Sequence, residues 1–316
     1  MTASTAALQE EEIRVTLPGR PISRLLRSGA LEFLVLIAFL GLIVYPTVLL
    51  YLPLVRNGFF VSDDHILLRE ATMTIGWQAW PNDPWIFSGV RHLAMWRPAG
   101  TLKWFWNAAA TTSNPAWYYA VNLGLHLVNA LLVLTLTRLL GLGIVGGLVG
   151  AAIFALHPIA TETVGWLAAR FDLVATAFAL AALIIQLASN RLANPRLWQV
   201  GRAIAPLLLL LSLLAKESAV VIPAIAVLCL LTIGGSGTVE RSGGTGAPTS
   251  LVGRFVQALR STWMLWIVVL AYVALRFALL GTLGGYGDYL STTPYWCIRQ
   301  VGSLFPLRLG RNRERS

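Results

Sequence analysis

The sequence predicts an all-α, polytopic membrane protein, a transmembrane helical bundle of about seven helices. Hydrophobic residues make up 56% of the 316 residues and charged residues only 12%, about half of what an ordinary soluble domain carries. The mean hydropathy is +0.69. The apolar residues are grouped in runs of roughly 15 to 25 residues, which is long enough to cross the hydrocarbon core of a bilayer.

The expected elements alternate between polar segments and apolar spans. Residues 1–30 form a polar cytoplasmic tail, and the first apolar run, 31–55, is too long for a cleaved signal peptide and is expected to remain as an anchor. Residues 56–115 form a long extracytoplasmic loop rich in Trp, which prefers the membrane interface, so we expect interfacial helices there. Further spans are expected at 116–138, 143–158, 172–189, 203–215, 218–233 and 262–281.

Two of these spans are short and contain proline. The runs 203–215 and 218–233 carry Pro206 and Pro223, and we expect them to be tilted, broken or partly re-entrant. Residues 234–260 are expected to form a cytoplasmic linker that begins with a flexible Gly/Ser stretch. The transmembrane domain is expected to occupy 31–290, followed by a basic tail at 291–316.

The distribution of basic residues predicts the orientation. With the N-terminus in the cytoplasm, the short outside loops contain only Arg170 and Lys216. The inside segments contain Arg14, Arg20, Arg24, Arg27, Arg138, Arg191, Arg196, Arg202, Arg241, Arg254 and Arg260. This excess follows the positive-inside rule. It also explains the net charge of +10 without nucleic-acid binding. No Asn-x-Ser/Thr sequon occurs, which favours a bacterial plasma membrane.

Ionisable and polar residues gather at the expected outer face. They are Asp63, Asp64, Arg97, His157, Glu162, Arg170, Asp172, Lys216, Glu217 and Tyr286, and Arg276 lies near the outer end of the last span. In 116–138, Asn122, His126 and Asn129 share one helix face. Each has a structural explanation as a solvated loop residue, a surface ion pair, a turn or an interhelical hydrogen bond. Their joint placement favours a site, because ionisable residues at a membrane are costly.

This residue set fits one class of chemistry. Arg97, Arg170 and Lys216 could bind a phosphate or pyrophosphate, a carboxylate could accept a proton from a hydroxyl, and a groove between helices could hold a lipid tail. The set therefore fits transfer of a group from a lipid phosphate to an acceptor at the outer face. Spacing does not identify that group as a sugar. Cys229 and Cys297 form no CxxC or His/Cys cluster, so no zinc site is expected.

Several stretches resemble the GT-C superfamily of membrane glycosyltransferases, especially the transmembrane, tetratricopeptide-containing O-mannosyltransferases and their bacterial relatives. They are "FFVSDDHILL", "WRPAGTLKWFWNAAATTSNPAWYYAVNLGLHLVNALL", "AAIFALHPIATETVGWLAARFDLVATAFAL", "LLAKESAVVIPAIAVL" and, more weakly, "LRFALLGTLGGYGDY". The third is the most specific. Together they cover roughly residues 31–290 in the family's order.

The resemblance implies an inverting glycosyltransferase that takes a monosaccharide from a polyprenyl-phosphate donor. Its catalytic acid maps onto the pair Asp63 and Asp64, of which Asp63 is favoured, and would activate the acceptor hydroxyl. Arg170, Lys216 and Arg97 would bind the leaving lipid phosphate. The residues expected to shape the site are His157, Glu162, Asp172, Glu217, His126 and Tyr286. No cofactor or divalent metal is expected, and the acceptor could be a protein, a glycan or a lipid.

The chain departs from the family in length. Family members have more membrane helices, and the closest carry tetratricopeptide repeats after them, whereas no such repeat occurs here. The chain could be a short form, a truncated reading frame or half of a two-chain protein. The alternative function is therefore a non-catalytic membrane subunit that binds or transports lipid-linked sugars. The absence of inverted repeats and the one-sided acids favour the enzyme.

Overall fold

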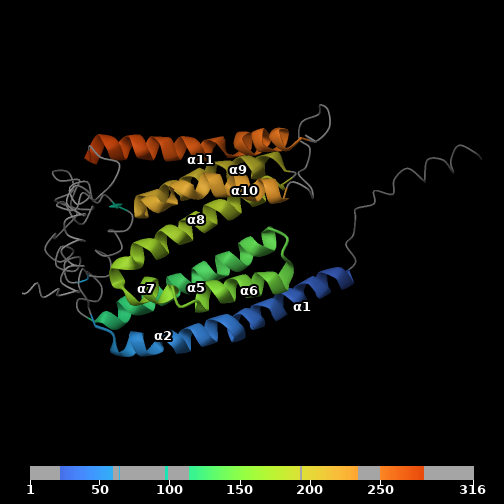
Figure 1. Ribbon diagram of the computed structural model, residues 1–316. Helices are drawn as coiled ribbons and strands as arrows, with labels where there is room; N and C mark the ends of the chain where they lie inside the picture. The colour runs from blue at the N-terminus through green and yellow to red at the C-terminus, as the bar shows by residue number, and fades with distance from the viewer. Residues whose placement is uncertain are drawn as a thin grey trace, which may run out of the picture.

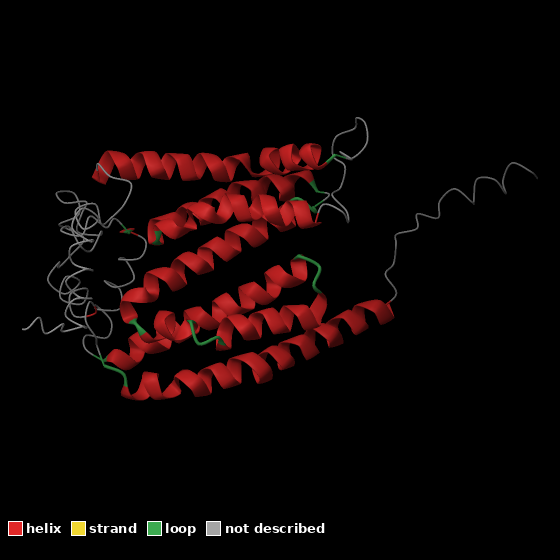
Figure 2. Ribbon diagram, viewed as in Figure 1, coloured by secondary structure: helices red, strands yellow, loops and turns green. Residues whose placement is uncertain are grey.

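The chain folds into a bundle of helices (Figure 1 and Figure 2). The computed structural model describes residues 22–59, 64, 97–98, 114–192, 194–233 and 250–280. Every secondary-structure element named within these ranges is a helix. This confirms the predicted all-α class. Its physical reason is that a helix satisfies its own backbone hydrogen bonds, which lipid cannot do.

The first apolar run forms one helical rod in three parts. α1 (Ile22–Phe39) continues into a π-helical turn, η1 (Leu40–Val44), and then into α2 (Tyr45–Asn57). Proline has no backbone N–H, and its ring crowds the preceding turn of a helix. The wide turn η1 lies directly before Pro46, where such an interruption of the hydrogen-bond ladder is expected.

The next two helices form an antiparallel hairpin. Asn114 caps α5 (Pro115–Leu139) by accepting a hydrogen bond from the backbone N–H of Ala116 at 3.0 Å. The hairpin then turns through two glycines with φ of 92° at Gly141 and 70° at Gly143. Both values lie in the left-handed region, which glycine adopts without steric cost. α6 (Gly143–Leu156) follows directly.

The remaining helices run back and forth between the two ends of the bundle. A short helix α7 (Ala160–Gly165) and a 3₁₀ turn η5 (Leu167–Ala169) lead into α8 (Arg170–Ser189). α9 (Pro195–Ala215) begins at an Asn194 cap. A second 3₁₀ turn, η6 (Glu217–Val221), precedes α10 (Ile222–Ile233). The last described helix is α11 (Leu251–Leu280).

The closest packing joins α8 to α9. Leu183, Leu209 and Leu213 are buried in the core between these helices. Near the far end, a Cβ added to Gly201 would lie 1.8 Å from Ser189 Oγ and 2.9 Å from Ser189 Cβ. Glycine is therefore required here for the two backbones to approach, as in other membrane helix pairs.

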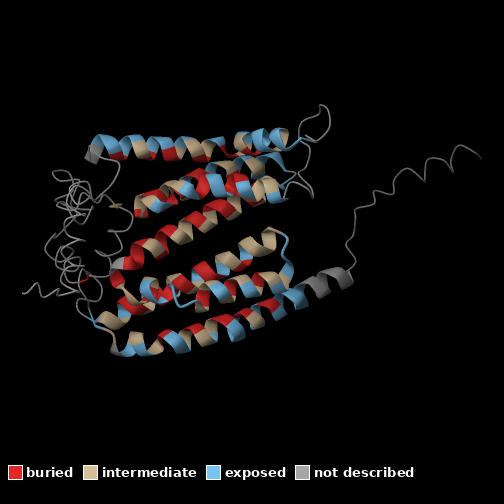
Figure 3. Cartoon of the chain, in the orientation of Figure 1, coloured by how far each residue is buried: buried red, intermediate tan, exposed pale blue. Residues whose placement is uncertain are grey.

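Five described helices are long and apolar enough to cross a membrane: Gly29–Arg56, Pro115–Leu139, Arg170–Ser189, Pro195–Ala215 and Leu251–Ala278. Two further apolar helices, Gly143–Leu156 and Glu217–Thr232, are shorter. A helix thus occurs at each of the seven predicted positions, and five reach spanning length. Large apolar side chains such as Val145, Leu228 and Leu270 are exposed on the outside of the bundle (Figure 3). Such a surface suits a lipid environment.

Three expected boundaries differ from the structure. α1 begins at Ile22, within the expected tail 1–30, because 22–30 contains good helix formers and no proline. α9 extends the expected short span 203–215 back to Pro195, since Pro206 is accommodated within a 21-residue helix. α11 begins at Leu251, so the last part of the expected linker 234–260 is helical; the Ser250 hydroxyl accepts from Gly253 N at 3.1 Å and starts it.

The helices stack in the order α1–α2, α5, α8, α9 and α11 across the bundle (Figure 1). Interhelical hydrogen bonds hold this order: Asn129 Nδ2 donates to Leu173 O at 3.0 Å, and Ser212 Oγ donates to Ala175 O at 2.7 Å. α2 and α11 end, and α5 and α8 begin, at the same end of the bundle, on the left of Figure 1. We call this the polar end, after Arg97, Asp172, Lys216, Glu217 and Arg276.

Candidate functional site

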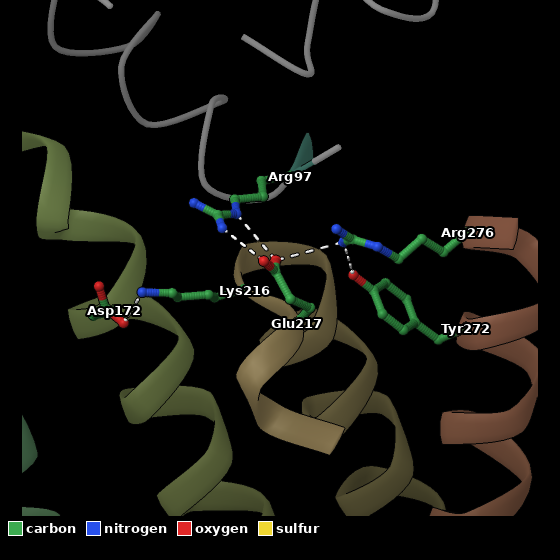
Figure 4. Close-up of polar contacts among 6 residues, drawn as sticks. All are labelled: Arg97, Asp172, Lys216, Glu217, Tyr272 and Arg276. Carbon is green, nitrogen blue, oxygen red and sulfur yellow. Dashed lines mark hydrogen bonds and ion pairs between the residues drawn. The ribbon is translucent and has the colours of Figure 1, made fainter. Parts of the chain in front are cut away.

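The polar end brings together charged side chains from three helical regions and the segment between α2 and α5. Figure 4 shows them pointing toward one another. Asp172 lies in the first turn of α8, and Arg276 lies near the end of α11. Lys216 and Glu217 stand where α9 gives way to η6. The chain breaks there from helix to an extended residue, with φ −156° and ψ 135° at Lys216, which places the two neighbouring charges on different partners.

Glu217 lies at the centre of this group. Arg97 donates to it through two nitrogens, Nη2 to Oε1 at 2.7 Å and Nε to Oε2 at 3.1 Å. Two parallel hydrogen bonds of this kind are the strongest and most directional contact between a guanidinium and a carboxylate. Arg276 Nη1 lies 3.5 Å from the same oxygen, Oε2, and 3.1 Å from the hydroxyl of Tyr272. One carboxylate therefore holds two arginines.

This environment keeps Glu217 ionised. Burial by itself would raise the pKa of the Glu217 carboxyl, but the hydrogen bonds and charge of Arg97, with the charge of Arg276, outweigh it and hold the pKa at about 2. A carboxylate this weakly basic is a poor proton acceptor near neutral pH. Glu217 is thus suited to holding cations and not to general-base catalysis.

A second ion pair lies beside the first. Lys216 Nζ contacts Asp172 Oδ1, and both side chains are partly exposed. The structure therefore pairs two of the cations predicted to bind phosphate, Lys216 and Arg97, with two acids predicted to shape the site. Exposed pairs of this kind add little stability, so an incoming anion can compete for Lys216 at small cost.

Arg170, the third predicted phosphate-binding cation, lies elsewhere. Its side chain is buried, and it donates from Nε to Asn122 Oδ1 at 2.7 Å and from Nη2 to the Tyr118 carbonyl at 2.8 Å. Its guanidinium carbon lies 5.4 Å from the centre of the Tyr118 ring. Asp64 is also buried and lies near enough to attract Arg170 electrostatically. This placement favours a structural role, tying α8 to α5, over the expected phosphate contact.

A pocket of about 510 Å³ lies among α5, α6, α7 and α8. His126, His157 and Asp172, three of the residues expected to shape the site, line it together with Asn129. His126 Nε2 lies 3.1 Å from the Ala155 carbonyl. Since a carbonyl only accepts, that nitrogen carries the hydrogen. The His126 ring stacks on Phe154 at 5.2 Å between centroids. Asp172 belongs to both the pocket and the polar end, so the two adjoin.

The other predicted residues are not part of these groups. Glu162 is exposed on α7. Asp63 and Tyr286 lie outside the described residues. Within the described ranges, no three His, Cys, Asp or Glu side chains gather closely enough to hold a metal ion. The expectation that no metal is needed stays a prediction.

The sequence gave no role to Arg276 or Tyr272, although the structure places both at the polar end. Arg276 is buried in the last turns of a span. An arginine within an apolar helix is itself an indication of a functional or paired group, because burying a charge in a membrane is costly. Tyr272 stands four residues earlier, on the same helix face, but nothing in its sequence context marks it.

Comparison with known proteins bears on what this arrangement does. The chain is 33% identical to Protein O-mannosyl-transferase Tmtc1 of Drosophila melanogaster over 191 residues, which is 57% of this chain and 21% of the relative. It is 30% identical to Protein O-mannosyl-transferase Tmtc2 of the same species over 202 residues, 61% of this chain and 21% of the relative. The chain thus matches about a fifth of the length of these curated relatives. No family model and no solved structure matches it.

These relatives support the resemblance to O-mannosyl-transferases of the transmembrane, tetratricopeptide-containing type. They do not bear on membership of the wider GT-C superfamily. Both come from an animal, so the expected bacterial origin stays a prediction, as does the cytoplasmic N-terminus.

Proposed function

We propose that this chain is a glycosyltransferase that moves a monosaccharide from a polyprenyl-phosphate donor to a hydroxyl acceptor at the extracytoplasmic face, with inversion. The similarity to two O-mannosyl-transferases carries the proposal of glycosyl transfer. The cation-rich polar end of a membrane bundle supports the lipid-phosphate donor, because arginine and lysine are the residues that bind phosphate groups.

The orientation in this proposal follows from the two ends of the bundle. Arg138, Arg196 and Arg254 lie on helix ends opposite the polar end. If those arginines face the cytoplasm, as the positive-inside rule favours, the polar end faces the other side. There the ends of α8, α9 and α11 meet the level of the lipid headgroups, where the phosphate of a lipid donor lies.

The residues would divide the work as follows. Lys216 and Arg97 would balance the charge that builds up on the lipid phosphate as it leaves. Asp63, predicted from the sequence, would take the proton of the acceptor hydroxyl. Asp64 would hold Arg170, and its proximity to that arginine makes it less basic than an unpaired carboxylate. The pocket beside Asp172 has room for a sugar ring, with His126 and Phe154 offering flat faces.

The test is sugar transfer from a labelled polyprenyl-phosphate monosaccharide, with membranes that contain the wild-type chain, Asp63→Asn or Asp64→Asn. We expect transfer by the wild type and loss of transfer in Asp63→Asn, because the amide cannot accept a proton. Asp64→Asn should reduce transfer together with stability. A nucleotide sugar offered instead of the lipid donor should give no product. Transfer unchanged in both variants would overturn the assignment of the base.

A further inference from the structure

Arg276 has an unusual environment for a charged residue in a membrane helix. Its side chain is only 4% exposed. Its printed polar contacts are two, a 3.5 Å contact to Glu217 and a 3.1 Å hydrogen bond to the Tyr272 hydroxyl, both through Nη1. Its Nε is buried and has no hydrogen-bond partner among the described residues. A buried guanidinium is costly unless its charge and donors are matched, so Arg276 is incompletely satisfied.

The charges around Arg276 do not balance. Arg97 makes the two short bonds to Glu217, and Arg276 has only the longer contact to an oxygen already in use. Two guanidinium groups thus share one carboxylate, and the neighbouring Lys216 is matched by Asp172. Among the described residues, this cluster has one positive charge in excess. A further anion would neutralise it.

The position of the two arginines defines which anion fits. Both contact the same carboxylate oxygen, so a single oxyanion can bridge them. A phosphate offers several oxygens to two planar guanidinium groups, whereas a carboxylate offers two. The site stands at the ends of α9 and α11, which are apolar enough to span a membrane. The lipid-facing surface below it would accommodate a hydrocarbon chain attached to that phosphate.

We propose that Arg97 and Arg276 form a binding site for the phosphate group of a polyprenyl-phosphate lipid, and that Glu217 competes with that phosphate for both guanidinium groups. The identity of the lipid rests on the proposed function; the anion site itself rests on the contacts above. Arg97 comes from the segment between α2 and α5, so exchange of Glu217 for phosphate would keep that segment joined to the bundle through the ligand.

The competing explanation is that Glu217 is only a structural ion pair. The two explanations differ in sign for one variant. If Glu217 is structural, Glu217→Gln loosens the two arginines and weakens any anion binding. If Glu217 competes with phosphate, the same change removes the competitor, and binding becomes tighter even though the fold loses an ion pair.

The experiment is equilibrium binding of a radiolabelled polyprenyl phosphate to the full chain in phosphatidylcholine nanodiscs. We expect Glu217→Gln to bind about tenfold more tightly than the wild type, since a charge-assisted contact no longer has to be displaced. Arg276→Gln, which keeps a polar side chain and removes the charge, should bind about tenfold more weakly. Glu32→Gln is the matched control, because Glu32 forms a similar two-bond pair with Arg138 at the opposite end of the bundle; it should leave binding unchanged.

Two further probes identify the source of the phosphate. An uncharged polyprenol should bind equally to all four forms of the chain, because it carries no anion. Inorganic phosphate should compete weakly; competition equal to that of the lipid would assign the site to free phosphate and overturn the lipid part of the proposal. Weaker or unchanged lipid binding in Glu217→Gln, with thermal unfolding showing a folded protein, would overturn the competition.

Arg276→Gln keeps the proposal testable if Glu217→Gln does not fold. Retained binding in folded Arg276→Gln would exclude Arg276 from the site. Because binding is measured without an acceptor, a chain that binds the lipid with this pattern but transfers no sugar would support the anion site and contradict the proposed enzyme. Transfer without this binding pattern would do the reverse.

Discussion

Replacing Arg170 by Met should destabilise the bundle strongly. Met keeps the aliphatic length of the side chain but removes the hydrogen bonds to Asn122 Oδ1 and the Tyr118 carbonyl. Hydrogen bonds to a charged group contribute about 1.5–3 kcal/mol each. Interhelical bonds in membranes fall at the low end, so the two bonds together give a loss of about 3 kcal/mol. The change also leaves Asp64 buried beside a neutral side chain, which adds to the cost.

The assay is unfolding in mixed micelles by titration with sodium dodecyl sulfate, followed by far-UV circular dichroism. Arg138→Met is the control, since Arg138 forms an exposed pair with Glu32, and exposed pairs contribute only about 0.2–1 kcal/mol. The reasoning would be refuted if Arg170→Met and Arg138→Met unfolded at the same detergent fraction. Arg170→Lys should be intermediate, because it retains the charge and loses the planar fork of donors.

The other predictions concern packing, pH and catalysis. Gly201→Ala should lower the unfolding free energy by about 1–3 kcal/mol, because its Cβ would clash with Ser189; Gly124→Ala, where no atom lies within 4 Å, should raise it slightly, and equal effects would contradict the close contact. The difference in unfolding free energy between the wild type and Glu217→Gln should be constant above pH 4.5 and shrink as the pH falls toward 2, since a carboxylate with a lowered pKa contributes stability that is lost on protonation; a change confined to pH above 4.5 would contradict the lowered pKa. Lys216→Ala should raise KM for the lipid donor about tenfold, while Asp172→Asn, which frees Lys216, should not; a fall in kcat alone would assign Lys216 to the leaving phosphate and not to ground-state binding.

The helices were predictable because lipid leaves few alternatives. Apolar runs such as 31–55 and 116–138 must be helical when no water can pair with the backbone. Their ends were less predictable. A span such as α11 continues beyond the apolar run, because Ser250 caps a polar turn that hydrophobicity alone does not reveal. The short 3₁₀ turn at Glu217 likewise depends on packing between α9 and α10.

The site was predictable in composition and less so in pairing. Charged residues flanking apolar runs indicated one polar end, and the sequence correctly placed Lys216 next to Glu217. Which cation meets which acid depends on how the helices rotate against each other, and sequence spacing contains no such information between α8, η6 and α11. Arg170 illustrates this: its position at the start of a span suggested an outer cation, whereas the rotation of α8 turns it toward Tyr118 and Asn122.

The most direct test of the account is photo-crosslinking with a polyprenyl phosphate that carries a diazirine close to its phosphate, because it requires no knowledge of the acceptor. The full chain in nanodiscs would be labelled, digested and mapped by mass spectrometry. We expect labelled peptides from the polar end, around Arg97, Lys216 and Arg276, and loss of that labelling when excess unmodified lipid is added. Labelling centred on the opposite end, around Arg138 and Arg254, or spread evenly over the lipid-facing surface, would contradict a lipid-phosphate site at the polar end.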